Sequence, residues 1–181
     1  MPSSTRLLDA PAMGRALVRM ASELAERTAA ADRIVIVGIQ RRGVQLADRL
    51  AKLTAPQLDR PLLRGTLDIT LYRDDLQAIG PRPVVHETSL PGDLDGATVV
   101  IVDDVLYTGR TVRAALDELA DFGRPSRILL TVLVDRGGRE LPIAADVTGL
   151  VVTATPGDLV AVHVAELDGD DGVELIRRGD R

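Results

Sequence analysis

VVIVDDVLYTGRT, the stretch Val99–Thr111, decides the fold expected of this chain. Its β-branched residues predict a buried strand of a parallel sheet, and a helical pattern begins within its last residues, TGRT. Such a strand delivers its carboxyl end to the ligand crevice of an open α/β sheet, and the amides of the following helix bind phosphate. Asp103 and Asp104 at this edge would repel a bare phosphate, whereas a sugar phosphate brings hydroxyl groups that donate to them. The stretch therefore predicts a clamp for ribose 5-phosphate.

Strand and helix patterns alternate around this stretch, which is typical of a parallel sheet with helices on both faces. Asp9 and Pro11 open a helical pattern that continues through Leu24. The polar residues Arg73–Pro83 predict a mobile loop, and Pro83–Thr88 returns as one arm of a hairpin. The remaining expected elements are helices over Gly43–Leu53 and from the Val99–Thr111 stretch to about Phe122, and strands over Arg33–Gly38, Thr66–Tyr72, Arg127–Val134, Gly149–Thr153, Leu159–Glu166 and Val173–Arg177. No repeat or linker interrupts the pattern, so we expect residues 1–181 to form one α/β domain.

Composition excludes several classes of protein. The chain is 45% hydrophobic with one Phe, two Tyr and no Trp, so its core must be aliphatic. It has no apolar run long enough to span a membrane and no secretion signal at its N-terminus, and we expect a cytoplasmic protein without a membrane partner. The absence of Cys removes disulfides, thiolate metal sites and a thiol nucleophile. A net charge of −5 argues against a generally basic nucleic-acid binder, although a local positive patch remains compatible with it.

A second glycine-bounded loop, Gly38–Gly43, follows the predicted strand Arg33–Gly38. Its spacing matches the first part of a P-loop, but Val44 stands where the P-loop lysine is required. The chain also lacks the G-x-G-x-x-G pattern of dinucleotide-binding proteins. ATPase and dinucleotide functions are therefore disfavoured.

Four segments together resemble a known family. Val99–Thr111 resembles the signature of the type I phosphoribosyltransferases, which use 5-phosphoribosyl-1-pyrophosphate (PRPP). Val37–Leu46 (VGIQRRGVQL), Leu67–Leu76 (LDITLYRDDL) and Val132–Asp146 (VLVDRGGRELPIAAD) narrow the resemblance to the bacterial pyrimidine-operon attenuation regulators that are also uracil phosphoribosyltransferases. The resemblance covers nearly the whole chain. It implies a central parallel sheet with helices on both faces and a small hood of short strands.

The resemblance implies conversion of uracil and PRPP to UMP and pyrophosphate. Asp103 and Asp104 would bind the ribose hydroxyls, with Mg²⁺ bridging sugar and pyrophosphate oxygens beside them. No direct protein ligand of the metal is identified. Arg73 would close over PRPP with its loop, contact the pyrophosphate and exclude water. These three residues form the expected catalytic set.

The expected PRPP and UMP contacts fall into three groups. Residues that follow the predicted strand Arg33–Gly38 face the pyrophosphate. Residues at the end of the Val99–Thr111 stretch contact PRPP or UMP; among them, Thr108, Gly109 and Thr111 hold the 5-phosphate, and a side chain at Gly109 would crowd the phosphate. Two further residues lie beside the base or nucleotide. In the same order, the groups are Arg41, Arg42 and Gly43; Leu106, Tyr107, Thr108, Gly109, Arg110 and Thr111; and Arg136 and Val160.

Structural readings compete with each of these roles. The aspartate pair can simply end a strand, the arginines of the second loop can be surface charges, and Val160 can be a core residue. His86 and His163 show no partner spacing and are interpreted as structural or incidental. The acidic residues Glu166, Asp168, Asp170 and Asp171 are interpreted as a solvated turn.

The regulatory activity of the family is expected to be weakened in this chain. Related regulators bind the leader of pyrimidine mRNA in response to UMP, but positions that are commonly polar or basic in the family differ here, and each lost cation removes a phosphate contact. The differing residues are Gly138 for His, Ala144 for Arg, Leu150 for Lys, and Val18 and Ser22 for Thr and His, whereas Arg139 remains. We therefore expect weak or absent RNA binding beside a retained transferase.

Two alternatives stay open at this point. The protein could be mainly a UMP-sensing RNA-binding regulator with weak or no catalysis. It could also transfer the phosphoribosyl group to another base, which the LYRDDL and VDRG segments disfavour. The oligomers of the family imply a homodimer or a higher assembly.

Overall fold

The computed structural model describes residues 3–72 and 87–177, which form two sheets. The larger is a five-stranded parallel sheet in the order β3-β2-β4-β5-β6. Its strands are β2 (Ile34–Ile39), β3 (Leu63–Leu67), β4 (Thr98–Leu106), β5 (Arg127–Asp135) and β6 (Val147–Val151). Strand β4 is central, and its first six residues are all buried. The stretch that decides the fold is thus the middle of the sheet, as expected for an apolar strand covered on both faces.

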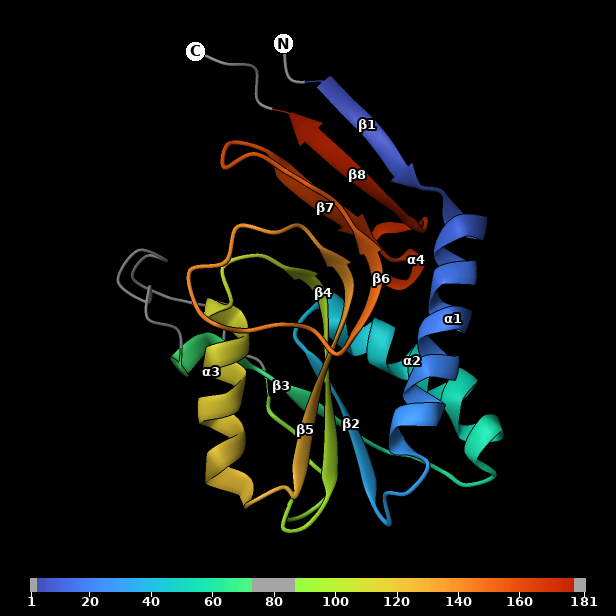
Figure 1. Ribbon diagram of the computed structural model, residues 1–181, viewed down its shortest axis with the longest axis vertical. Coiled ribbons are helices and arrows are strands. Elements are labelled where there is room, and N and C mark those ends of the chain that lie inside the picture. The colour runs from blue at the N-terminus through green and yellow to red at the C-terminus, as the bar shows by residue number, and fades with distance from the viewer. Residues whose placement is uncertain (1–2, 73–86, 178–181) are drawn as a thin grey trace.

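Helices cover both faces of this sheet, which confirms the predicted architecture (Figure 1). Helices α1 (Ala10–Thr28) and α2 (Arg42–Leu58) pack on one face, where they share a core with Val100 and Val102. Helix α3 (Arg110–Leu119) packs on the other face with Val99 and Ile101. Alternate residues of β4 therefore serve two separate cores, as the two-residue period of a strand requires.

A three-stranded antiparallel sheet forms a hood beside the carboxyl ends of the parallel strands (Figure 1). It consists of β1 (Ser3–Leu8), β8 (Gly172–Arg177) and β7 (Leu159–His163), with the one-turn helix α4 (Ala165–Asp168) between β7 and β8. Val162 and Val173 of the hood are buried in the same core as α1 and α2. The hood is thereby fixed against the main sheet.

Most predicted elements are confirmed with small changes in their ends. The Asp9 carboxylate caps α1 by accepting a hydrogen bond from the Ala12 amide at 2.8 Å. The helix after β4 ends at Leu119 and continues as a 3₁₀ turn, η3 (Ala120–Phe122). Strand β7 ends at His163 rather than Glu166, because the chain turns into α4.

One predicted strand is wrong in position. The strand expected over Thr66–Tyr72 is instead β3, and Ile69–Tyr72 forms a 3₁₀ turn, η1. The physical reason is Asp68, whose carboxylate accepts hydrogen bonds from the backbone amide and the hydroxyl of Thr70. Such local bonds compete with a strand. The expected Arg73–Pro83 loop lies outside the described residues, and so does most of the Pro83–Thr88 arm.

Strand β1 was not predicted. Its sequence SSTRLL is mostly polar and exposed, so it carries no apolar alternation. It is held by backbone pairing to β8 and by the Ser4 hydroxyl, which donates to Glu174 at 2.9 Å. Across residues 3–72 and 87–177, no helix is both long and apolar enough to cross a membrane.

Candidate active site at the end of strand β4

Asp103 and Asp104 lie where β4 approaches its carboxyl end, Asp103 buried and Asp104 half-buried. The Asp104 amide donates to Oδ1 of Asp103 at 2.9 Å, and the Val105 amide donates to Oδ1 of Asp104 at 2.8 Å. The backbone of the strand thus orients both carboxylates. An oriented pair of carboxylates can accept hydrogen bonds from vicinal hydroxyl groups, which is the geometry predicted for a ribose.

The environment of Asp103 favours its neutral form. Burial raises the pKa of the Asp103 carboxyl well above its usual range, and the adjacent Asp104 carboxylate raises it further. The hydrogen bond from the Asp104 amide opposes this increase but does not cancel it. The Asp103 carboxyl therefore keeps its proton to a higher pH than a solvated aspartate does.

We predict that this difference appears in the pH dependence of stability. The folded-state pKa of Asp103 lies above its unfolded value of about 4, so the unfolded chain releases its proton first as pH rises. Asp103 therefore destabilises the fold progressively above about pH 4. In Asp103→Asn, which keeps an oxygen for the Asp104 amide, the free energy of unfolding should increase relative to the wild type between pH 4 and pH 8. Urea unfolding over that range measures the difference, and a constant difference contradicts the prediction.

The turn Tyr107–Gly109 joins β4 to the N-terminus of α3. Gly109 is the residue that caps α3, and the Thr108 hydroxyl accepts from the Arg110 amide at 3.3 Å. Amides in the first turn of a helix have no acceptor within the helix and attract anions. Residues 106–111 therefore meet at one helix start, as predicted for a phosphate-binding turn.

The structural reason for Gly109 differs from the predicted one. Its φ is 93°, in the region that favours glycine, and a Cβ there would approach Leu141 to 3.3 Å and Ile143 to 3.4 Å. The segment after β5 packs against the turn Tyr107–Gly109. The amides of Glu140 and Leu141 both donate to the Thr108 carbonyl, at 2.9 and 3.1 Å. Backbone conformation and this underlying contact account for the glycine without reference to a phosphate.

The second predicted loop lies beside the first. Gly43, in the first turn of α2, is buried against β4, where a Cβ would lie 2.5 Å from the Val102 carbonyl oxygen. Only a glycine allows α2 to approach the strand this closely. Hydrogen bonds to Asp168 raise the pKa of Arg42, and the nearby Asp104 carboxylate contributes to the same increase. Arg41 precedes the helix with an exposed side chain, and the peptide bond between Gln40 and Arg41 is cis.

The acidic residues after β7 lie in a largely exposed turn, as predicted, but three of them also form ion pairs with α2 that the sequence did not indicate. Asp168 accepts two hydrogen bonds from Arg42, at 3.1 Å from Nε and 2.8 Å from Nη2. Glu166 and Asp171 both accept from Arg49 of α2. These ion pairs attach the hood to the helix that carries Arg42.

Arg136 and Val160 are both buried, on opposite sides of the junction between the sheet and the hood. The Arg136 guanidinium donates to the carbonyls of Asp158 at 2.8 Å and Thr155 at 2.9 Å, and it stacks 3.8 Å from the centre of the Tyr107 ring. It thus connects the segment that leads into β7 with the turn Tyr107–Gly109. Val160 belongs to the core shared with α1 and α2.

Arg73 lies outside the described residues, as does His86. The chain before Arg73 is anchored by the Tyr72 hydroxyl, which donates to Asp121 at 2.5 Å. Thr88, on the far side of that segment, donates to the buried carboxyl of Glu118 in α3. Sequence reasoning missed Glu118, because a single glutamate in a helix gives no signal of burial.

The residues of this site supply only part of the coordination shell of a divalent cation. The parts of the chain that the structure describes contain no group of three or more His, Cys, Asp or Glu that could hold a metal ion. Mg²⁺ is commonly bound through one or two carboxylates together with substrate phosphates rather than by an all-protein cage. The Asp103–Asp104 pair fits that mode, in which the metal arrives with the substrate.

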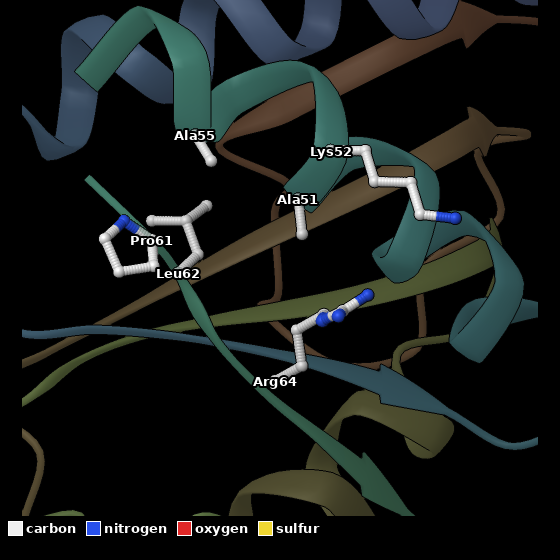
Figure 2. Close-up of a pocket in the computed structure, with 6 residues that line it drawn as sticks. All are labelled: Ala51, Lys52, Ala55, Pro61, Leu62 and Arg64. Carbon is white, nitrogen blue, oxygen red and sulfur yellow. The ribbon is translucent and has the colours of Figure 1, made fainter. Parts of the chain in front are cut away.

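A separate hollow of about 190 Å³ lies between α2 and the start of β3 (Figure 2). It is lined by Ala51, Lys52, Ala55, Pro61, Leu62 and Arg64. None of the predicted site residues lines it, and its β-strand wall is the beginning of β3 rather than a carboxyl end. Ligands of open α/β sheets bind outside the carboxyl ends of the strands, which favours the site at β4.

These features define a phosphoribosyltransferase, and comparison with known families agrees. Residues 3–166 match the phosphoribosyl transferase domain family. The chain belongs to this family.

The most informative relatives are all called Bifunctional protein PyrR. The chain is 53% identical over 178 residues to the protein from Thermus thermophilus, which covers 98% of each chain. It is 53% identical over 174 residues to that of a Roseiflexus species, covering 95% of this chain and 94% of the relative. The protein from Deinococcus radiodurans is 49% identical over 174 residues, which cover 96% and 94%.

Solved structures confirm the fold. A hypoxanthine phosphoribosyltransferase from Staphylococcus aureus matches with a TM-score of 0.70 and 18% identity over 94% of this chain and 90% of that one. The hypoxanthine phosphoribosyltransferase of Trypanosoma cruzi matches with a TM-score of 0.71 and 15% identity over 96% of each chain. At such identities the likeness concerns the type I phosphoribosyltransferase fold and not the base that is used.

Proposed function

We propose that this protein is a uracil phosphoribosyltransferase, which joins uracil to the ribose of PRPP and releases pyrophosphate. One observation carries the proposal: an aspartate pair, one member buried and the other half-buried, lies near the end of the central strand and shortly before a helix-capping turn, in a chain about half identical to Bifunctional protein PyrR along nearly its full length. We include in this proposal that residues 1–181 act as one domain in the cytoplasm, and that they assemble as a homodimer or a higher oligomer.

In the proposed reaction, a uracil nitrogen forms a bond to C1 of the ribose as the bond to pyrophosphate breaks, and the proton of that nitrogen is released. Positive charge develops at the ribosyl centre, as in other glycosyl transfers. The Asp104 carboxylate, half-buried and oriented by the Val105 amide, is suited to stabilise that charge and to hold a ribose hydroxyl. The amides and hydroxyls of Thr108 to Thr111 would hold the 5-phosphate. Positioning and electrostatics carry the catalysis, so no covalent nucleophile is required.

The departing pyrophosphate needs positive charge. Arg42, at the start of α2, is suited to that role because it lies near Asp104 and presents its guanidinium at the same edge of the sheet. Arg41 and Arg73 are the other proposed cationic contacts. Mg²⁺, when bound with PRPP beside Asp103 and Asp104, would neutralise phosphate charge and help the pyrophosphate to leave.

For the base, we propose the region after β5. Val134 and Asp135 end β5, the strand next to β4, and Arg136 follows it; the backbone of these three residues is suited to read the edge of the uracil ring. Arg136 would support this region by stacking on Tyr107. Val160 would support it as part of the apolar core shared with α1 and α2.

The direct experiment is to incubate the protein with Mg²⁺, PRPP and labelled bases and to separate the products. UMP should form from uracil, at a rate at least 100-fold above that of hypoxanthine or guanine nucleotides. Formation of a purine nucleotide in preference to UMP would overturn the choice of base. Binding of UMP without turnover would favour a nucleotide-sensing regulator.

We further propose that RNA binding is weak in this chain. The one basic position that remains from the predicted set, Arg139, is engaged internally: its guanidinium donates to Asp135, to the Tyr107 carbonyl at 2.8 Å and to the Ile143 carbonyl at 2.9 Å. Val18 is 53% exposed on α1, where a polar side chain is expected of an RNA contact. Without free cations at these positions, few phosphate contacts remain.

Filter binding to the leader RNA of the pyrimidine operon, with and without UMP, tests this proposal. We expect no saturable binding at about 0.15 M salt, because too few phosphates are neutralised. The double variant Ala144→Arg/Leu150→Lys should gain affinity with a steeper dependence on salt. Tight UMP-dependent binding by the wild-type protein would contradict the proposal.

A further inference from the structure

The hood and the proposed pyrophosphate loop meet at a single side chain, Asp168 of α4. Its Oδ1 accepts from Nη2 of Arg42 at 2.8 Å, and its Oδ2 accepts from Nε of Arg42 at 3.1 Å. Oδ2 also accepts from the Val164 amide at 2.9 Å. The carboxylate is therefore oriented by the hood backbone while it binds one edge of the guanidinium.

The contact leaves the other edge of Arg42 available. A guanidinium has five N–H donors in a planar fork, and Asp168 engages the edge formed by Nε and Nη2. The Nη1 hydrogens and the second Nη2 hydrogen form a further edge, which has the geometry for two parallel bonds to a phosphate. In the described part of the chain, Asp168 is the one hydrogen-bonding partner found for Arg42.

The turn that carries Asp168 is itself fixed. Arg49, seven residues after Arg42 on α2, donates to Glu166 and to Asp171, which flank Asp168. Its contacts to these two carboxylates span 2.6 to 2.9 Å. The Ala165 amide also donates to Asp171 at 2.7 Å. Both ends of α4 are thus attached to α2, so Asp168 has little freedom to move away from Arg42.

We propose that Asp168 is a positioning residue for PRPP binding, which holds the Arg42 guanidinium with one edge open toward the pyrophosphate. The inference rests on the proposed function, because it takes Arg42 as a contact of the leaving group. The hydrogen bonds from Arg42 lower the pKa of Asp168 to about 2, so the carboxylate stays charged throughout the neutral range. An unrestrained arginine would have to lose rotamer freedom on binding, and the ion pair removes that loss in advance.

Neutralising Asp168 has two opposing effects on the affinity for PRPP. Removing a negative charge near an anionic substrate should strengthen its binding. Loss of orientation should weaken it. The direction of the change therefore separates a positioning role from a general influence of charge.

Isothermal titration calorimetry with PRPP and Mg²⁺, and separately with pyrophosphate and Mg²⁺, provides the test. In Asp168→Asn, which keeps an oxygen for the Val164 amide, both dissociation constants should rise about 10-fold. The matched control is Asp170→Asn, which removes the same charge two residues away from a side chain that is 60% exposed and pairs with Arg6. The control should leave both constants unchanged within about twofold. Asp168→Glu should recover part of the lost affinity.

A double-mutant cycle completes the test. If Asp168 acts through Arg42, Asp168→Asn should change the PRPP dissociation constant by less than twofold in an Arg42→Ala background. Equal effects in both backgrounds, or tighter binding by Asp168→Asn, would overturn the inference and leave the proposed function intact. An Arg42→Ala variant that binds PRPP normally would overturn it as well. A wild-type protein that binds no PRPP would overturn both the inference and the proposed function.

Discussion

Asp104→Asn is expected to lower kcat for UMP formation by about 10²- to 10⁴-fold. The substitution keeps the shape of the side chain and its oxygen for the Val105 amide, but removes the negative charge. Asp104 is half-buried at the end of β4, whereas Asp103 behind it is buried and favours its neutral form. In the proposed reaction, Asp104 is therefore the carboxylate expected to face the developing oxocarbenium ion. A steady-state assay with saturating uracil and PRPP measures the loss.

The matched control is Asp117→Asn on α3, whose side chain is 54% exposed and pairs with Arg113 in the same helix. This variant should retain kcat within about twofold, since exposed pairs contribute little. Thermal unfolding of both variants verifies that they are folded. Wild-type activity in Asp104→Asn would place the catalytic charge elsewhere.

Arg136→Leu is expected to reduce the free energy of unfolding by about 3 kcal/mol. Arg136 is only 5% exposed, and its guanidinium donates to the carbonyls of Thr155 and Asp158, in the connection that leads into β7, and stacks on Tyr107. A leucine cannot replace those donors, so the Asp158 carbonyl loses its Arg136 donor and the Thr155 carbonyl keeps only the Asp158 amide, which donates to it at 3.0 Å. The Tyr107 ring also loses its stacking contact, and the phosphate-binding turn is loosened with it. Urea unfolding followed by circular dichroism measures the change.

Arg124→Leu is the control for this variant. Arg124 is exposed in the connection between η3 and β5, so the same substitution should change stability by no more than about 0.5 kcal/mol. Equal stability of Arg136→Leu and the wild type would show that the junction of hood and sheet does not depend on this guanidinium.

The parts of the fold that the sequence predicts are those with a strong local pattern. The apolar run before Asp103 is the central strand, and the Asp9–Pro11 start of α1 is confirmed by its cap. Strand β1 gave no such pattern, because it is polar and held by backbone pairing to β8. The error at Thr66–Tyr72 has a local cause, since the Asp68 side chain competes with the strand for the backbone.

The candidate site was only partly accessible from sequence. The aspartate pair, the TGRT turn and the second loop are each contiguous, and parallel strands bring their carboxyl ends to one edge of the sheet. The role of Asp168 was missed because its partner Arg42 is 126 positions away in the chain. The nucleotide contact expected of Arg136 stays a prediction, and the structure adds that its guanidinium joins the segment before β7 to Tyr107, a tertiary contact without a sequence signal. Long-range ion pairs of this kind depend on how the hood sits on α2.

A crystal structure of the protein with UMP tests the central claim most directly. We predict that the 5-phosphate lies against the backbone amides of Thr108 to Thr111, with the ribose hydroxyls within hydrogen-bonding distance of Asp103 and Asp104. The uracil ring should lie beside the segment after β5. A nucleotide bound elsewhere on the molecule, or a ribose that contacts neither aspartate, would contradict this account of the site.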